Sequence, residues 1–126
     1  MKLAHLFITA ILALNVITAH ALEIKPYSAK VLEDAQKANM PIALHFYADW
    51  CPICHAQEKV LNNFKNDKTL NLTVLVVNYD KEKELKKKLN VRTQSTLIVY
   101  KGSIEKARLA GETAPDKIKT ALRSAL

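Results

Sequence analysis

Glycine is scarce in this chain of 126 residues, which contains only Gly102 and Gly111. Loops that bind nucleotide phosphates need several closely spaced glycines, because the backbone must approach the phosphate closely. No segment of the sequence has that spacing. We therefore expect no organic cofactor.

Aromatic residues are also few, at 6% of the chain, and none lies among the lysines of residues 81–88. The formal net charge is +7, and this segment contributes five lysines against two glutamates. Proteins that bind single-stranded nucleic acid usually combine basic with aromatic side chains. Glu82 and Glu84 each precede a lysine, Lys86 and Lys88, by four residues, which is typical of a solvated helix face. We expect such a face here, and no nucleic-acid partner.

No apolar run is long enough to span a bilayer comfortably, which takes about 20 residues. The longest, residues 6–19, follows a basic start at Lys2 and leads into Ala19-His20-Ala21, a small-x-small cleavage site. These features predict a secretory signal peptide over residues 1–21 and a domain over residues 22–126 that works in the periplasm or another extracytoplasmic space. A buried first helix of a cytosolic protein is the alternative. No cysteine follows the run, so we expect no membrane anchor after cleavage.

The chain has two cysteines, Cys51 and Cys54, three positions apart. A structural disulfide usually closes a longer loop, because its stabilising effect grows with loop length. A disulfide between cysteines this close is better suited to being formed and broken than to holding a fold together. Together with His55 it could instead supply three ligands to copper or zinc, but a closed zinc site needs a fourth, and the predicted domain has only one other histidine, His45.

The remaining sequence alternates between helical and strand patterns, without repeats or linkers. Helices are predicted over residues 27–39, 52–65, 81–89 and from 115 onward, and strands over 42–47, 70–79, 96–100 and 104–110. This order predicts one α/β domain, with a central mixed β-sheet flanked by helices and a closing hairpin that adds an antiparallel strand. We also expect Asp80 to cap the charged helix and Leu126 to join the apolar face of the last one.

Cys51 falls between a predicted buried strand and a helix, and Pro52 suits the first turn of that helix. The Cys51 sulfur would then lie near unpaired backbone N–H groups and the positive end of the helix dipole. Both favour the thiolate, the form that attacks disulfides. Cys54 lies one turn further along, where it could attack a mixed disulfide on Cys51. We therefore expect Cys51 to be the nucleophile and Cys54 the resolving thiol.

Residues 46–54, FYADWCPIC, resemble the active-site strand, tryptophan and CxxC of the thioredoxin superfamily. Residues 96–102 resemble the strand and turn opposite that site, and residues 47–51 are especially similar to the C-terminal periplasmic domain of the membrane disulfide reductase DsbD. The resemblance implies the thioredoxin fold, dithiol–disulfide exchange with protein thiols or disulfides, and a membrane disulfide reductase as one candidate partner. Trp50 would shield the sulfurs, contact the substrate or simply pack. The direction of exchange stays open.

One departure from the family pattern is His45, six residues before Cys51, where thioredoxins usually have a buried carboxylate that helps to deprotonate the second cysteine. Histidine has an ordinary pKa of about 6.5 and can exchange protons near neutrality. Burial would favour its neutral, proton-accepting form. His45 is therefore either the proton acceptor for Cys54 or a core histidine with a hydrogen-bond partner.

The other departure is Ser95, where the family usually has a cis-proline before the threonine that matches Thr96. A cis bond before a residue other than proline costs about 2.5–4 kcal/mol. We therefore expect a trans Gln94–Ser95 bond and a remodelled substrate loop. Because that proline also discourages metal binding in the family, copper or zinc handling remains an alternative function. A binding module with structural cysteines is a third.

Overall fold

Two segments that are apolar at nearly every position form the centre of the sheet, where both faces are covered. In the computed structural model, which describes residues 21–126, they are β2 (Pro41–Tyr47) and β3 (Thr73–Asn78), and they pair in parallel. Except for Ala21, the predicted signal peptide lies outside the described residues.

Over the described residues the sheet has five strands in the order β1-β3-β2-β4-β5. β1 (Glu23–Pro26) is parallel to β3, whereas β4 (Thr96–Lys101) is antiparallel to β2 and forms a hairpin with β5 (Ile104–Ala110). The predicted mixed sheet and hairpin are confirmed. β1 was not predicted, because it is a four-residue, mostly exposed strand without apolar alternation.

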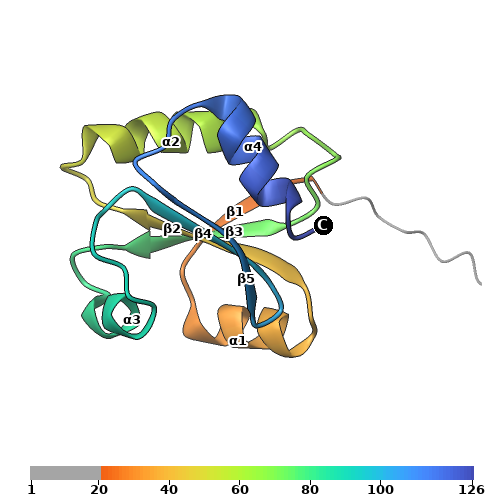
Figure 1. The fold of residues 1–126 in the computed structure, drawn as a ribbon, viewed down its shortest axis with the longest axis horizontal. Coiled ribbons are helices and arrows are strands. Elements are labelled where there is room, and N and C mark those ends of the chain that lie inside the picture. The colour runs from red at the N-terminus through yellow and green to blue at the C-terminus, as the bar shows by residue number, and fades with distance from the viewer. Residues whose placement is uncertain (1–20) are drawn as a thin grey trace, which may run out of the picture.

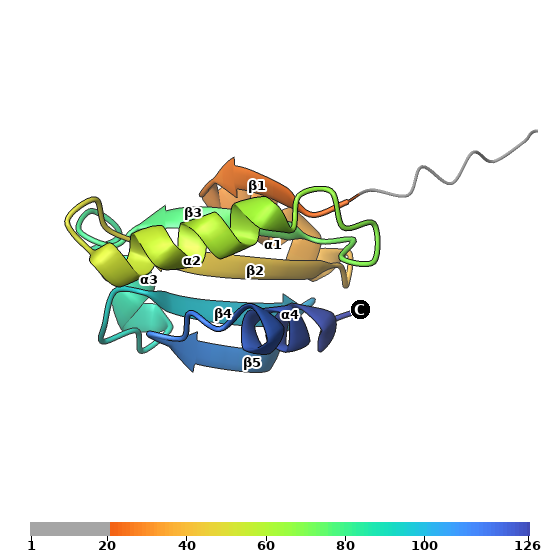
Figure 2. The ribbon, with the colours of Figure 1, turned by 90° about the horizontal axis from the view of Figure 1, so that it is seen from above.

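Helices cover both faces of the sheet. α2 (Pro52–Asn63) and α4 (Pro115–Arg123) lie on one face, and α1 (Ala29–Lys37) and α3 (Lys83–Lys88) lie on the other (Figure 1 and Figure 2). Each predicted helix is present but shorter than predicted. A proline in the first turn begins α2 and α4, as expected of a residue that has no N–H to satisfy.

The alternation of side chains along β2 divides the core into two layers. Ile42, Leu44 and Phe46 pack on the side of α1, whereas Ala43 belongs to the layer that includes residues of α2 and α4. His45 has the same orientation as Ala43. This places a buried imidazole directly beneath α2.

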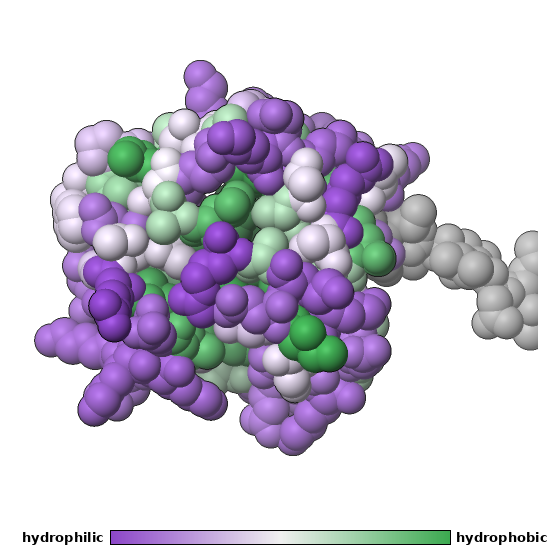
Figure 3. Space-filling model, in the orientation of Figure 1, coloured by the Kyte–Doolittle hydropathy of each residue, from purple (hydrophilic) through white to green (hydrophobic). Residues whose placement is uncertain are grey.

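Two expectations about the surface, those for Asp80 and Leu126, are wrong, whereas α3 has no buried residue, as expected of a solvated helix. The residue before α3 is Glu82, whose side chain caps nothing, and Asp80 instead binds Trp50. No ion pair joins Glu82 or Glu84 to a lysine in the described chain, and the Lys86 ammonium lies 3.6 Å from the centroid of the Tyr79 ring. Hydrophilic side chains do project over the region of α3 (Figure 3).

The second wrong expectation concerns Leu126, which is 51% exposed because α4 has already ended at Arg123. The other residues expected on the apolar face of this helix, Ile118, Ala121 and Leu122, are buried. None of the helices between residues 21 and 126 has the length and apolar character needed to cross a membrane.

Candidate functional site

The two cysteines lie at the start of α2 and form a disulfide, with Cα atoms 5.2 Å apart. Cys51 is the N-cap residue of the helix, and its Sγ accepts a hydrogen bond from the backbone N–H of Cys54 at 3.1 Å. The first turn of a helix has N–H groups without intrahelical partners. One of them is therefore directed at the Cys51 sulfur, as the sequence predicts.

The disulfide is almost entirely covered, with Cys51 1% exposed and Cys54 not exposed at all. The residues beside it are not: Trp50 is 59% exposed and Ile53 45%. The indole N–H of Trp50 donates to Oδ2 of Asp80 at 2.9 Å, which holds the ring against the loop after β3. Trp50 thus lies on the surface next to the disulfide.

His45 is 1% exposed, and its Nε2 lies 2.9 Å from Oε1 of Gln57. Burial lowers the pKa of His45 below its ordinary value of 6.5, and the weaker effects of the Gln57 hydrogen bond and the Glu58 charge oppose this. The imidazole is therefore neutral at neutral pH. Its hydrogen-bond partner is Gln57 and not Cys54.

Gln57 was not predicted as a site residue. It is 2% exposed, and its side-chain amide donates to the backbone carbonyls of Ser95 and Glu112, both at 2.9 Å. A helical pattern could have revealed it, because Gln57 lies three residues after Cys54 and four before Leu61, both of which are buried. A glutamine on that face must find partners inside the protein.

Ser95 adopts the left-handed backbone conformation, with φ +59°, and no peptide bond among residues 21–126 is cis. The expected trans Gln94–Ser95 bond is confirmed. The Ser95 N–H donates to the carbonyl of Phe46 at 2.9 Å, and its own carbonyl accepts from the N–H of Gly111 at 3.0 Å. The Thr96 hydroxyl donates to the carbonyl of Thr93 at 2.8 Å, which closes the loop before β4.

His55 is exposed, but it is not free. Its Nε2 lies 2.8 Å from the carbonyl of Asp49, to which only a ring N–H can donate, and its Nδ1 lies 2.9 Å from the Tyr47 hydroxyl. The ring is thereby held against the loop after β2. No three His, Cys, Asp or Glu side chains within residues 21–126 come together as a metal-binding group.

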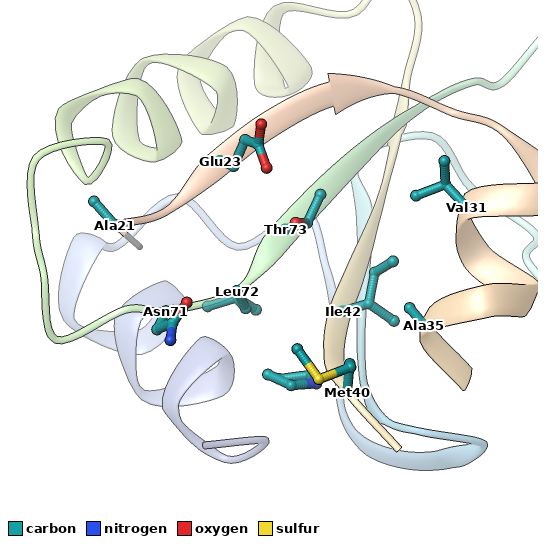
Figure 4. A pocket seen from close by; sticks show the side chains of 10 residues that line it. Ala21, Glu23, Val31, Ala35, Met40, Ile42, Asn71, Leu72 and Thr73 are labelled. Carbon is teal, nitrogen blue, oxygen red and sulfur yellow. The ribbon is translucent and has the colours of Figure 1, made fainter. Parts of the chain in front are cut away.

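A separate cavity of about 250 Å³ lies away from the disulfide. It is lined by residues at the beginning of β2 and β3, such as Ile42 and Thr73, and by Glu23 and Met40 (Figure 4). Because Cys51 follows the opposite end of β2, this cavity is not part of the cysteine site.

Comparison with known proteins gives consistent results. The family model described as thioredoxin matches residues 21–124. Thioredoxin from Rickettsia bellii is 25% identical over 79 residues, which cover 63% of this chain and 75% of that protein. Thioredoxin from Mycobacterium tuberculosis is 28% identical over 88 residues, covering 70% and 76%. The crystal structure of Trxlp from Edwardsiella tarda has a TM-score of 0.75 at 36% identity, and the match covers 79% of this chain and 98% of Trxlp.

We predict that Ser95→Pro destabilises the protein by more than about 1 kcal/mol. Proline fixes φ near −65° and has no N–H, whereas Ser95 has φ +59° and donates to Phe46. Ser95→Gly is the control, because glycine keeps the N–H and tolerates positive φ. Denaturant midpoints should fall for proline and change little for glycine. Equal midpoints would show that the loop does not require this conformation.

Proposed function

The chain belongs to the thioredoxin family, and we propose that it acts outside the cytoplasm with Cys51 as the nucleophile and Cys54 as the resolving thiol. Its family and its CxxC disulfide make it a protein disulfide oxidoreductase. The observation that carries the assignment of roles is the hydrogen bond from the Cys54 N–H to Sγ of Cys51. A donor at that atom stabilises negative charge on Cys51 once the disulfide is open.

The proposed exchange has two steps. The thiolate of reduced Cys51 attacks one sulfur of a partner disulfide, and the other partner sulfur leaves with the electron pair as a thiolate. Cys54 then loses its proton and attacks Sγ of Cys51. The Cys51–Cys54 disulfide forms, and the partner leaves with both sulfurs reduced. Two electrons pass to the partner, and the same steps in reverse oxidise it.

The second step requires a base, because Cys54 is completely buried. We propose that His45 accepts its proton. Cys54 and Gln57 lie on the same side of α2, and Gln57 contacts the imidazole, so His45 lies beneath that side. In this proposal the Cys54 proton passes to the ring nitrogen of His45 that is not bound to Gln57.

The proposed location and partner have a different basis. The features of residues 1–21 support export. The similarity of residues 47–51 to the periplasmic domain of DsbD supports a membrane disulfide reductase as the protein that renews the reduced form. Trp50 and Ile53 offer exposed apolar surface beside the disulfide for a protein substrate.

The roles of the two cysteines can be separated by substitution. Cys51→Ser should abolish insulin reduction, because no nucleophile remains at the start of α2. Cys54→Ser should accumulate mixed disulfides with partners, because the first step still occurs and the second cannot. Non-reducing electrophoresis with mass mapping identifies the linked residue. Mixed disulfides on position 54 in Cys51→Ser, with none on position 51 in Cys54→Ser, would reverse the assignment.

We predict that His45→Ala slows resolution on the order of 10²-fold or more without comparable slowing of the first attack. In the parent protein, resolution should also slow as the pH falls below 6.5 through the lowered pKa of His45, because protonated imidazole cannot accept a proton. This decrease in the resolution rate at low pH should be missing in His45→Ala. His45→Asp should recover much of the resolution rate. Stopped-flow kinetics measure both steps. A normal resolution rate in a destabilised His45→Ala would make His45 a core residue only.

Export predicts a defined N-terminus. Intact-mass analysis of the protein recovered from its native host should give a chain that begins at Leu22, after cleavage behind Ala19-His20-Ala21. Fractionation should find it outside the cytoplasm. A full-length chain in the cytosolic fraction would contradict the proposed location and leave the exchange chemistry intact.

A further inference from the structure

We infer that Gln57 is a positioning residue that holds His45 in one tautomer, with the proton on Nε2 and the lone pair on Nδ1. The tautomer follows from the hydrogen bonds alone. Its consequence for catalysis rests on the proposed function, in which His45 accepts the proton of Cys54.

The first step is the orientation of the Gln57 amide. Its nitrogen lies 2.9 Å from the carbonyl oxygens of both Ser95 and Glu112. A carbonyl oxygen can only accept, and an amide nitrogen has two hydrogens to donate, so both are used. The rotated amide would direct its oxygen at two carbonyl oxygens in an environment where Gln57 is 2% exposed. Only one orientation of the amide is therefore chemically possible.

The second step is the His45 ring. With the Gln57 nitrogen directed at the two carbonyls, Oε1 faces Nε2 of His45 at 2.9 Å. Oε1 can only accept, so Nε2 carries a hydrogen. A neutral imidazole has one N–H, which leaves the lone pair on Nδ1. Any proton that His45 takes up must bind Nδ1, and the bond from Nε2 to Gln57 persists in both charge states.

The other groups around the His45 ring influence its charge, whereas Gln57 controls its tautomer. On β2 the Tyr47 ring packs against it edge-on, with centroids 5.9 Å apart. α2 contributes the Gln57 amide and the charge of Glu58, and the neighbouring strands β3 and β4 place Val76 and Leu97, neither of them titratable, opposite His45. Burial is the largest influence on the charge of the ring, and it keeps the ring neutral. Gln57 decides which nitrogen of that neutral ring can accept a proton.

Gln57 also connects the two positions at which the sequence departs from the family pattern. One end of its amide binds His45, and the other binds the carbonyl of Ser95. The positive φ of Ser95 accompanies this arrangement, in which the same carbonyl also accepts from Gly111. The loop before β4 and the proposed base are thus parts of one hydrogen-bonded unit.

The test begins with the unsubstituted protein. Long-range ¹H–¹⁵N correlation spectra of ¹⁵N-labelled protein above pH 6.5 should show His45 with a protonated Nε2 and an unprotonated Nδ1. A protonated Nδ1, or an averaged mixture of the two forms, would overturn the inference. This measurement needs no variant and no activity, so it stands even if a substitution prevents folding.

Gln57→Met tests the consequence, because methionine has a similar length and neither accepts from Nε2 nor donates to the carbonyls. We expect a changed tautomer signature and a resolution rate lower by about tenfold or more, with the first attack little affected. Leu61→Ala is the matched control: Leu61 is buried one turn further along α2, and its truncation should lower the denaturant midpoint while leaving the tautomer and resolution unchanged. Equal slowing in both variants would reduce Gln57 to a structural residue.

A double-mutant cycle separates this inference from the function on which it rests. In a His45→Ala background, Gln57→Met should not slow resolution further, because the group it positions is gone. Further slowing by the same factor would show that Gln57 does not act through His45. An inactive parent with the expected tautomer would refute the exchange function and leave the tautomer assignment standing. An active parent with the opposite tautomer would refute the assignment alone.

Discussion

A buried amide must satisfy both its donors and its acceptor inside the protein, and the site of this molecule is organised around that requirement at Gln57. One side chain of α2 binds β2 through His45 and binds the two loops that flank the β4–β5 hairpin through backbone carbonyls. No buried side-chain nitrogen or oxygen within residues 21–126 lacks a partner. Leaving one such group unpaired costs about 1–3 kcal/mol. Helix, strand and loops therefore cannot shift independently of one another.

The position of the disulfide depends on the same placement of α2 against β2. α2 begins shortly after β2 has ended, so the N–H of Cys54 in its first turn donates to the Cys51 sulfur, while Cys54 and Gln57 face inward on successive turns. The Cys51 sulfur thus lies at the helix end that stabilises negative charge. Both sulfurs are almost completely buried. They differ in their place on the helix, because Cys51 is its N-cap and Cys54 lies in its first turn.

The two departures from the thioredoxin pattern, His45 and Ser95, can both be explained by the hydrogen bonds that these residues donate. A carboxylate at position 45 would not present an N–H to Oε1 of Gln57, and a proline at position 95 would lack the N–H that binds Phe46. Histidine and serine each supply the donor that their surroundings require. Each of these substitutions would leave one acceptor without its partner, Oε1 of Gln57 in the first case and the carbonyl of Phe46 in the second.

Most of the fold could be predicted from local patterns. The apolar runs of β2, β3 and β4, the prolines that begin α2 and α4, and the turn before β5 each specify an element within a few residues. β1 could not be predicted, because a short edge strand gains its stability from pairing with β3 and not from its own sequence. Asp80 shows the same limit. It matches the cap preference of a helix start, but the donor it binds, the indole of Trp50, lies 30 residues away in the sequence.

The sequence by itself determined the chemistry of the site: two thiols one helical turn apart, an imidazole six residues before them, and a serine where a proline is usual. These are properties of residue type and spacing, and they require no more structure than a strand followed by a helix. Only the tertiary structure decided which hydrogen bonds the imidazole makes. The tautomer of His45 depends on a glutamine 12 residues away, and the orientation of that glutamine depends on carbonyls 38 and 55 residues further along. Hydrogen bonds of this kind form only when distant segments meet in a space that excludes water, because in solvent each group would bind water instead.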